Sequence, residues 1–402
     1  MISPKKIYLV APSLIPQPTW GGKYILEAKG WQNKGGFKDR KIGQSYELFS
    51  GSFLDVESNT SASKEFGGWL GNSSDVRTAV YQGKKANLVK LEKLIASDPK
   101  LILGPKVLKT HGRKPGILIK FTQALGNSFQ IHIGQRIVSK KWQAKAESWY
   151  YLEPGLLTLG LRKKTKPVEF KKCCQRIDAA LNQISLEIKK NRKTAADGRS
   201  EALKIVKREN PWLYVNLVTA KKDDLIDLSE GGLHHSWEED SSRFPLGNLV
   251  YELCQDVMDP VSTLRCFDRG KIKDDGSLRK LDISDYFRYL NSQPEYNNPE
   301  NHRLRPKLVW SGTKGKIEAL LRTGNYCLDR FKLKGSYQGE SARTRDSYHH
   351  LFVQEGRVFI KAGRRGLVLT RCHSAFIPAA IGAYELMPLG KKEAVILKTF
   401  VN

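Results

Sequence analysis

The feature that most constrains this chain is a change of hydrophobic period near residue 167. Before it, short runs of alternating apolar and polar residues, bounded by Gly, Asn and Pro, predict β-strands. From Pro167 the apolar residues instead recur every three or four positions between Phe170 and Ile188, which predicts one amphipathic helix. A chain with both periods must combine β-sheets with a helical segment. The strands predicted before the change are Ser45–Phe49, Leu118–Phe121, Ser128–Ile133 and Ser148–Leu152.

Helical spacing also occurs at Leu88–Ala96, inside the β-rich region, and we expect a further short helix there. After the long helix, residues 194–199 are predicted to form an exposed loop and Ser200–Lys207 a second helix. A Pro- and Asn-rich stretch, Ser292–Pro306, is interpreted as a linker. Strand patterns return at Trp212–Leu217, Asn248–Cys254, Leu308–Trp310, Tyr348–Val353, Arg357–Ile360, Leu367–Thr370 and Glu385–Met387.

This order predicts a mainly β chain with two antiparallel β-barrels or jelly rolls and a helical insertion. We expect four segments. Residues 1–165 form the first part of one barrel with a short helical segment, and residues 166–210 form the helical insertion. Residues 211–291 complete that barrel, and residues 292–402 form the linker and a second barrel.

Composition sets the class of protein. With 40% hydrophobic and 9% aromatic residues, the chain can bury a sizeable core. No window approaches the roughly 20 apolar residues of a membrane helix, and Pro12, Pro16 and Pro18 interrupt the first apolar stretch, which argues against a signal peptide. Six Cys without a paired C-x-x-C spacing fit neither a disulfide scaffold nor a thiolate zinc site. We therefore expect a cytoplasmic protein without membrane contact.

The charge is strongly positive: 68 Lys and Arg against 41 Asp and Glu give +27. Such an excess favours anionic ligands. Much of it lies in helix-end and loop runs such as Lys189–Lys193, which are typical of solvated surfaces. Because no basic stretch alternates with aromatic residues and no zinc-finger or RNP-like motif occurs, we do not expect a nucleic-acid partner. The sequence does not determine the oligomeric state.

Four residues of ligand type have a suggestive spacing. Gln130 and His132 are two positions apart, so on a strand their side chains point to the same face. Glu147 has the same relation to Lys145, and His234 follows a double glycine, Gly231-Gly232, that allows a sharp turn. Two imidazoles, a carboxylate and an amide oxygen would suit Zn²⁺ or another divalent metal. Each of these residues alone is more often an ordinary core or surface residue.

Several segments spread along the chain match one known family. They include Pro18-Thr19-Trp20-Gly21-Gly22, Ser128-Phe129-Gln130-Ile131-His132, Lys145-Ala146-Glu147-Ser148-Trp149-Tyr150, Gly231-Gly232-Leu233-His234, Tyr251-Glu252-Leu253-Cys254-Gln255 and Ser374-Ala375-Phe376-Ile377-Pro378. With these segments the sequence resembles the type I mannose-6-phosphate isomerases, and the resemblance covers nearly the whole chain, most weakly between residues 275 and 345. It implies a double cupin with a helical insertion. The chain departs from the family at Ile133 and at Ser229-Glu230-Gly231, where the family usually has proline, but neither departure removes a ligand.

The resemblance assigns a role to each candidate residue. The metal ligands it implies are Gln130, His132, Glu147 and His234, with His235 as the alternative if the turn is shifted by one residue. It implies active-site roles for Arg265, Lys145 and Glu252. It places Ser128 and Lys271 near the substrate phosphate, where Arg269 is an alternative to Lys271.

The implied reaction interconverts mannose 6-phosphate and fructose 6-phosphate by moving a proton between C1 and C2 through an enediolate. A divalent metal and Arg265 would stabilise the developing oxyanion. Glu252, His234 and a metal-bound water are the alternatives for the base. A cupin that binds a metal and a sugar phosphate as a sensor, without turnover, is the competing hypothesis.

Overall fold

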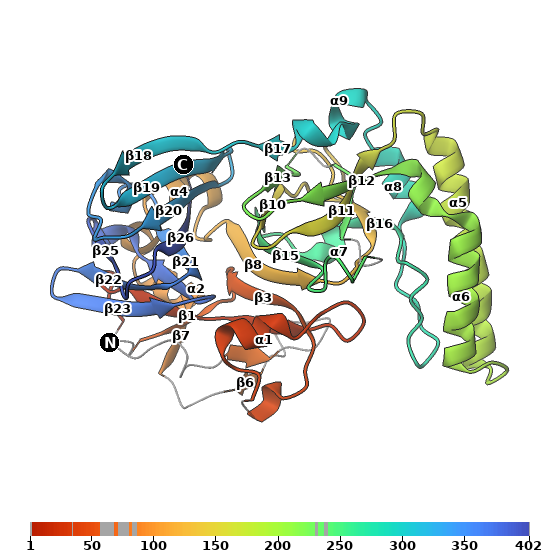
Figure 1. Cartoon of the computed structure of the whole chain (residues 1–402), viewed down its shortest axis with the longest axis horizontal. Coiled ribbons are helices and arrows are strands. Elements are labelled where there is room, and N and C mark those ends of the chain that lie inside the picture. The colour runs from red at the N-terminus through yellow and green to blue at the C-terminus, as the bar shows by residue number, and fades with distance from the viewer. Residues whose placement is uncertain are drawn as a thin grey trace. The chain divides into compact units, whose positions relative to one another are not determined.

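The computed structural model describes residues 2–33, 35–56, 68–70, 80–82, 87–229, 232–236 and 240–401. The chain forms two compact units (Figure 1). Unit 1 comprises residues 1–123, 250–256 and 304–402, and unit 2 comprises residues 124–249 and 257–303. The N-terminal segment therefore packs with the C-terminal segment in unit 1. The two units are defined by contacts between residues in the structure, whereas the four predicted segments are defined by the sequence pattern. The boundaries of the four segments therefore stay predictions.

Unit 1 is built on a sheet in which nine strands are described. Its core lies on the side where Phe331 is opposite Ile396, and Ile396 in turn is opposite Val353. The strand order is β18 (Lys307–Gly312), β19 (Gly315–Arg322), β20 (Cys327–Leu333), β26 (Ala394–Phe400), β21 (His349–Glu355), β24 (Ser374–Ile377), β1 (Tyr8–Ala11), β4 (Phe53–Asp55) and β7 (Leu88–Lys90). A smaller sheet contains β23 (Arg365–Thr370), β22 (Arg357–Ala362) and β25 (Glu385–Pro388). The strands predicted after residue 306 are thus confirmed.

Unit 1 also contains β2 (Ser13–Pro16), β3 (Ile42–Leu48) and most of β8 (Ile117–Ala124), with β3 paired to both of the others. The helix predicted at Leu88–Ala96 begins three residues later, as α2 (Leu91–Ser97), because Leu88–Lys90 pair with β4 as strand β7. The other described strands and α-helices of unit 1 are β5 (Gly68–Leu70), β6 (Val80–Gln82), α1 (Tyr24–Lys29), α3 (Pro99–Leu103) and α4 (Pro105–His111).

Unit 2 contains a second antiparallel sheet, and this sheet carries most of the candidate site. Its order is β12 (Val215–Ala220), β11 (Gly155–Leu161), β14 (His234–Ser236), β9 (Phe129–Ile131) and β16 (Leu264–Phe267). Strand β10 (Glu147–Tyr151) pairs with β13 (Leu225–Asp227) in the same unit. The short helices are α7 (Asp259–Ser262), α8 (Ile283–Tyr289) and α9 (Pro294–Asn297). Strand β15 (Asn248–Gln255) begins in unit 2 and continues into unit 1.

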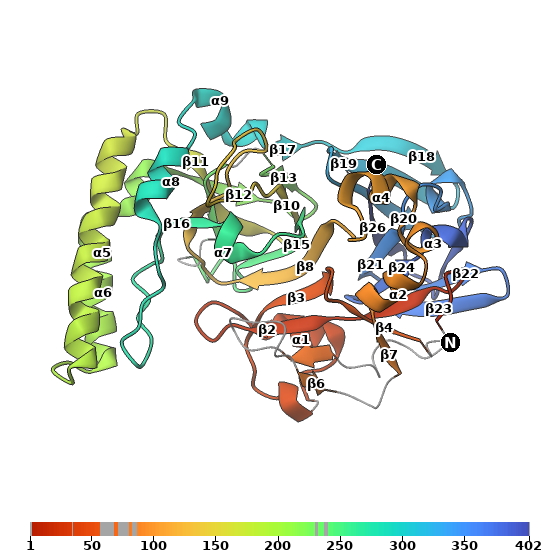
Figure 2. The same ribbon diagram turned by 180° about the vertical axis from the view of Figure 1, so that it is seen from behind.

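The helical insertion is an antiparallel pair, α5 (Pro167–Lys189) and α6 (Ala195–Glu209), which lie side by side at an edge of unit 2 (Figures 1 and 2). The long helix is confirmed, but the predicted loop over 194–199 is wrong. Helix α6 already begins at Ala195 because the Thr194 hydroxyl accepts a hydrogen bond from the Asp197 backbone N–H at 3.1 Å. A Cβ at Gly198 would meet Ile188 Cδ1 at 2.6 Å and Ile184 Cγ2 at 2.9 Å, so the glycine lets α6 lie close to α5.

Two other segments differ from the sequence prediction. Within Trp212–Leu217 only the last residues are extended, since Pro211–Tyr214 form a turn of 3-10 helix before β12. The predicted linker contains α9 and the two-residue strand β17 (Arg303–Leu304), and the division between the units falls within β17. Among the described residues, no helix combines the length and the apolar character needed to cross a membrane.

Candidate metal centre

Three neighbouring strands of unit 2 bring three candidate residues into one row. Strand β14 pairs with β9 so that His234 lies opposite Gln130, and β9 pairs with β16 so that Gln130 lies opposite Arg265. Residues directly opposite each other in antiparallel strands point to the same face of the sheet. His234, Gln130 and Arg265 are therefore neighbours on one face, although they are far apart in the sequence.

Next to this row, two histidines converge on one carboxylate. His132 Nε2 lies 3.0 Å from Glu147 Oε2, and His234 Nε2 lies 3.5 Å from Glu147 Oε1. All three side chains are buried, and their ligand atoms lie within 4.8 Å of one another. Gln130 Nε2 donates a hydrogen bond of 3.0 Å to His234 Nε2, so the amide belongs to the same cluster. The structure thus brings the four predicted ligand-type residues together.

Backbone carbonyls fix how the two rings face the site. Nδ1 of His132 donates to the carbonyl of Ser262, and Nδ1 of His234 donates to the carbonyl of Gly232, each at 2.8 Å. With Nδ1 protonated, a neutral imidazole presents the lone pair of Nε2. Burial lowers the pKa of His132, more than Glu147 raises it, so this ring is neutral near pH 7.

The side chains in this cluster offer ligand atoms that could hold a cation. Neutral His132 Nε2 and ionised Glu147 Oε2 are both acceptors, yet they face each other at 3.0 Å. A cation between them removes this repulsion. Two imidazole nitrogens and one carboxylate form the ligand set of many catalytic zinc sites, and half a turn of the Gln130 amide would offer a further oxygen. These residues therefore fit a divalent metal such as Zn²⁺.

Glu147 is held ionised by its surroundings. Burial acts to raise the pKa of its carboxyl, but the positive charge of Lys145 is the main cause that opposes burial, and the pKa lies well below its usual range. Lys145 Nζ lies 3.1 Å from Glu147 Oε2, and the Trp149 indole N–H donates to Oε1 at 2.8 Å. Each carboxylate oxygen thus has a defined donor.

Asp259 is a charged residue of this region that sequence reasoning missed. Its carboxylate lies 3.1 Å from Lys145 Nζ and 3.7 Å from an Arg265 nitrogen, so it bridges the two cations. Arg265 also donates to the Ser128 hydroxyl and to the Thr263 carbonyl, both at 3.2 Å. Burial lowers the pKa of Arg265, but a guanidinium remains protonated at neutral pH. A lone Asp at a helix start carries no sequence signal for such a role.

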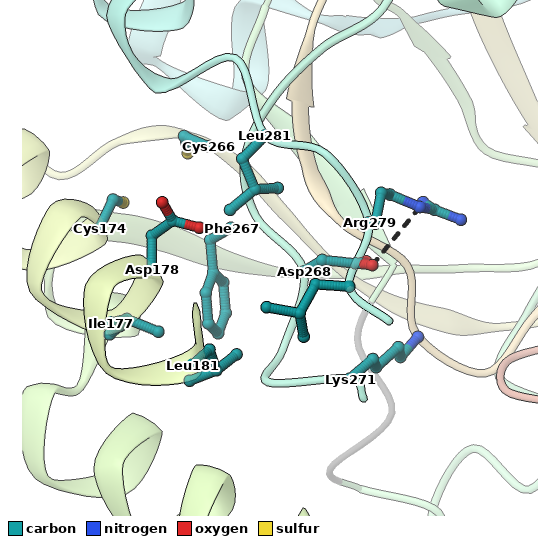
Figure 3. A pocket seen from close by; sticks show the side chains of 11 residues that line it. Cys174, Ile177, Asp178, Leu181, Cys266, Phe267, Asp268, Lys271, Arg279 and Leu281 are labelled. Carbon is teal, nitrogen blue, oxygen red and sulfur yellow. Dashed lines mark ion pairs between the residues drawn. The ribbon is translucent and has the colours of Figure 1, made fainter. Parts of the chain in front are cut away.

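The predicted phosphate-binding residues lie in the same unit. Ser128 is buried and bonded to Arg265, as described above. Lys271 Nζ donates to the carbonyl of Gly126 at 2.6 Å, which holds its charge beside the segment that carries Ser128. Figure 3 shows Lys271 at the edge of a small pocket between α5 and residues 266–281, where Asp268 and Arg279 form an ion pair of 3.4 Å. Arg269, the alternative to Lys271, instead has its guanidinium over the Trp212 ring, 5.9 Å from the centroid.

His235 points away from the metal centre. It lies opposite Thr158, in the register next to that of His234, and its ring packs against Phe129 with 4.7 Å between centroids. Burial, followed by the charge of Arg269, lowers its pKa well below the usual value. Of the two histidines, His234 is therefore the one that faces Glu147. Gly231 of the predicted double-glycine turn and Glu230 lie outside the described residues.

Glu252 belongs to unit 1, on β15. Its carboxylate lies 2.8 Å from Lys120 Nζ and accepts a hydrogen bond of 2.9 Å from the Thr122 hydroxyl. Both oxygens are therefore held by residues of β8. Lys120 and Thr122, like Asp259, are buried or partly buried polar residues that the sequence analysis did not single out.

Comparison with solved structures gives a consistent result along the whole chain. The fold is similar to that of mannose 6-phosphate isomerase from Bacillus subtilis, with a TM-score of 0.64, 13% sequence identity, and coverage of 98% of this chain and 99% of that one. For the apo form of mannose 6-phosphate isomerase from Salmonella typhimurium, the TM-score is 0.62 and the sequence identity 14%, with coverage of 98% of this chain and 99% of that one. For a zinc-bound mannose 6-phosphate isomerase, the TM-score is 0.62 and the sequence identity 14%, with coverage of 97% of this chain and 98% of that one. The chain has the fold of these isomerases.

The predicted mainly β architecture of a double cupin with a helical insertion is thereby confirmed. No protein-family model and no curated protein sequence matches the chain. At 13–14% identity, the likeness concerns the fold alone.

Proposed function

We propose that the protein is a metal-dependent aldose-ketose isomerase that interconverts mannose 6-phosphate and fructose 6-phosphate. The observation that carries the proposal is the convergence of His132, Glu147 and His234 as buried acceptors, in a chain whose fold is that of mannose 6-phosphate isomerases. Arg265 also supports the proposal, because it lies in the same row across three strands as Gln130 and His234, next to the proposed metal ligands.

In this proposal His132, Glu147, His234 and Gln130 hold a divalent ion, with Zn²⁺ as the first choice. When bound, such an ion supplies Lewis-acid polarisation of the sugar oxygens. Carbonyl bonds to both imidazoles and the indole bond to Glu147 hold the ligands in place, which lowers the cost of binding the ion. These hydrogen bonds raise the affinity of the protein for the metal ion.

The proton moves between C1 and C2 of the sugar phosphate, and the intermediate enediolate carries negative charge on oxygen. Arg265 stabilises that charge, since its guanidinium is partly buried and already oriented by Ser128, Thr263 and Asp259. Lys145 adds a second positive charge beside Glu147. We assign the base to Glu252, a carboxylate that can accept a proton from carbon; His234 is the alternative.

Lys271, with Ser128, is assigned to the phosphate of the substrate. A dianion gains from a lysine charge and a hydroxyl donor in a partly buried position. Lys271 Nζ is already anchored on the Gly126 carbonyl, so little side-chain freedom is lost when the phosphate binds.

The test is a coupled assay for fructose 6-phosphate formed from mannose 6-phosphate by the zinc-loaded protein. Turnover supports the proposal, and Lys271→Ala should raise KM by about tenfold at nearly constant kcat, as loss of one charge-assisted bond predicts. Bound metal and bound sugar phosphate without turnover would support the sensor hypothesis instead. Binding of neither ligand would contradict both.

A further inference from the structure

Trp149 contacts two of the proposed metal ligands at once. It lies on β10 two residues after Glu147, so both side chains point to the same face of the strand. Its indole N–H donates to Glu147 Oε1 at 2.8 Å, and its ring meets the His234 ring edge-on at 5.2 Å between centroids. Only 3% of the residue is exposed, so the indole has little freedom to move.

This hydrogen bond restrains the one soft torsion of the carboxylate. The terminal torsion of a glutamate is broad, and its two oxygens exchange places on a half turn. With Oε1 held by the indole, Oε2 stays beside His132 Nε2 at 3.0 Å and Lys145 Nζ at 3.1 Å. The packed indole holds its N–H in one place and so keeps Oε1 from rotating away.

We infer that Trp149 is a positioning residue, which fixes the carboxylate of Glu147 in the orientation that a divalent cation requires. It acts through Glu147 and has no assigned contact with the substrate. The inference rests on the proposed metal site and adds Trp149 to the residues that determine how tightly this site binds Zn²⁺. Trp149→Phe keeps an aromatic side chain but removes the N–H together with part of the buried ring, so its effect is compared with that of a control that loses the same volume.

The chain offers a matched control in the same unit. Trp142 is also buried, and its indole N–H also donates to a carboxylate, Asp285 Oδ2, at 2.9 Å. Asp285 lies in α8 and is not one of the proposed ligands. Trp142→Phe therefore removes the same kind of bond without touching the candidate metal centre.

The experiment measures the affinity of the metal-free full-length protein for Zn²⁺ by competition with a chromophoric chelator. Trp149→Phe should bind Zn²⁺ about 10- to 100-fold more weakly than the wild type, the usual effect of losing a partner that orients a ligand. Trp142→Phe should stay within about threefold of the wild type, because the ligands and their partners are unchanged. Thermal unfolding of the metal-free variants is recorded alongside.

The outcomes separate this inference from the proposal beneath it. A purely structural role of Trp149 would lower the unfolding temperature and leave the Zn²⁺ affinity of the folded variant unchanged, which would overturn the inference. If circular dichroism shows that Trp149→Phe does not fold, Trp149→Tyr replaces it, since its hydroxyl lies at the ring tip and not at the indole nitrogen. Failure of the wild type to bind Zn²⁺ would overturn the proposed metal site and this inference with it.

Discussion

Asp259 shows how single residues act in this molecule. It bridges Lys145 and Arg265, two cations that the sequence resemblance treats separately, and it is itself 44% exposed on its side chain. Lys145 in turn contacts Glu147. Three ion pairs in series, through Asp259 and Lys145, therefore connect the candidate charge-stabilising arginine to Glu147, a candidate metal ligand.

Replacing Arg265 by Ala should leave metal binding intact and lower kcat about 10²- to 10³-fold, the usual cost of removing one donor that stabilises an oxyanion. None of the four proposed ligands is bonded directly to Arg265 in the described structure. Zinc content per chain and kcat are measured on the same sample. Arg176→Ala is the control, because this arginine of α5 pairs with Glu209, outside the row of candidate residues. Near-normal kcat in Arg265→Ala would refute the assigned role.

At the scale of elements, the strands and the long helix follow from local patterns, whereas their ends depend on contacts. The alternation at Ser45–Phe49 appears as β3, and the three-to-four spacing after Pro167 appears as α5. The start of α6 differs from the prediction, although Thr194 and Asp197 have the spacing of a capping box. Residues 194–199 have polar, loop-like composition, but the Thr194 cap and the packing of Gly198 on α5 extend the helix through them.

The cap of α6 gives a test at this scale. Thr194→Ala removes the acceptor for the Asp197 N–H and should lower the free energy of unfolding by about 1 kcal/mol, without changing Zn²⁺ affinity. Chemical denaturation monitored by circular dichroism measures the free energy of unfolding. Ser200→Ala, at an exposed position within the same helix, should be neutral or slightly stabilising, since Ala is the better helix former. Equal stability of Thr194→Ala and Ser200→Ala would contradict the capping role.

At the scale of the whole chain, the resemblance in sequence anticipated the fold and the grouping of Gln130, His132, Glu147 and His234. It could not anticipate partners set by the tertiary structure alone. The pairing of Asp259 with Lys145, for example, joins residues 114 positions apart. The association of residues 1–123 with 304–402 in unit 1 has the same origin, since β1 pairs with β24 and no local pattern specifies that pairing.

Buried histidines in both units predict how stability responds to acid. Burial lowers the pKa of His350 from 6.5 to about 3, and it also lowers the pKa of His132, His235 and His349. As the pH falls below 6.5, the unfolded chain binds protons that the folded chain does not, so the free energy of unfolding decreases. From pH 7 to pH 5, His350 alone should account for about 2 kcal/mol. In His350→Gln, the loss of unfolding free energy between pH 7 and pH 5 should be smaller by about this amount. An unchanged loss would contradict the role assigned to His350.

The central claim is that this chain is an isomerase whose turnover requires a metal held by His132, Glu147, His234 and Gln130. The most direct test strips the protein of metal and titrates Zn²⁺ back while the rate of conversion of mannose 6-phosphate to fructose 6-phosphate is recorded, with His132→Ala in parallel. We predict no turnover without metal, a rate that rises in proportion to bound Zn²⁺ until one ion is bound per chain, and no recovery in His132→Ala. Turnover that survives metal removal, or a fully zinc-loaded protein with no turnover, would contradict the claim.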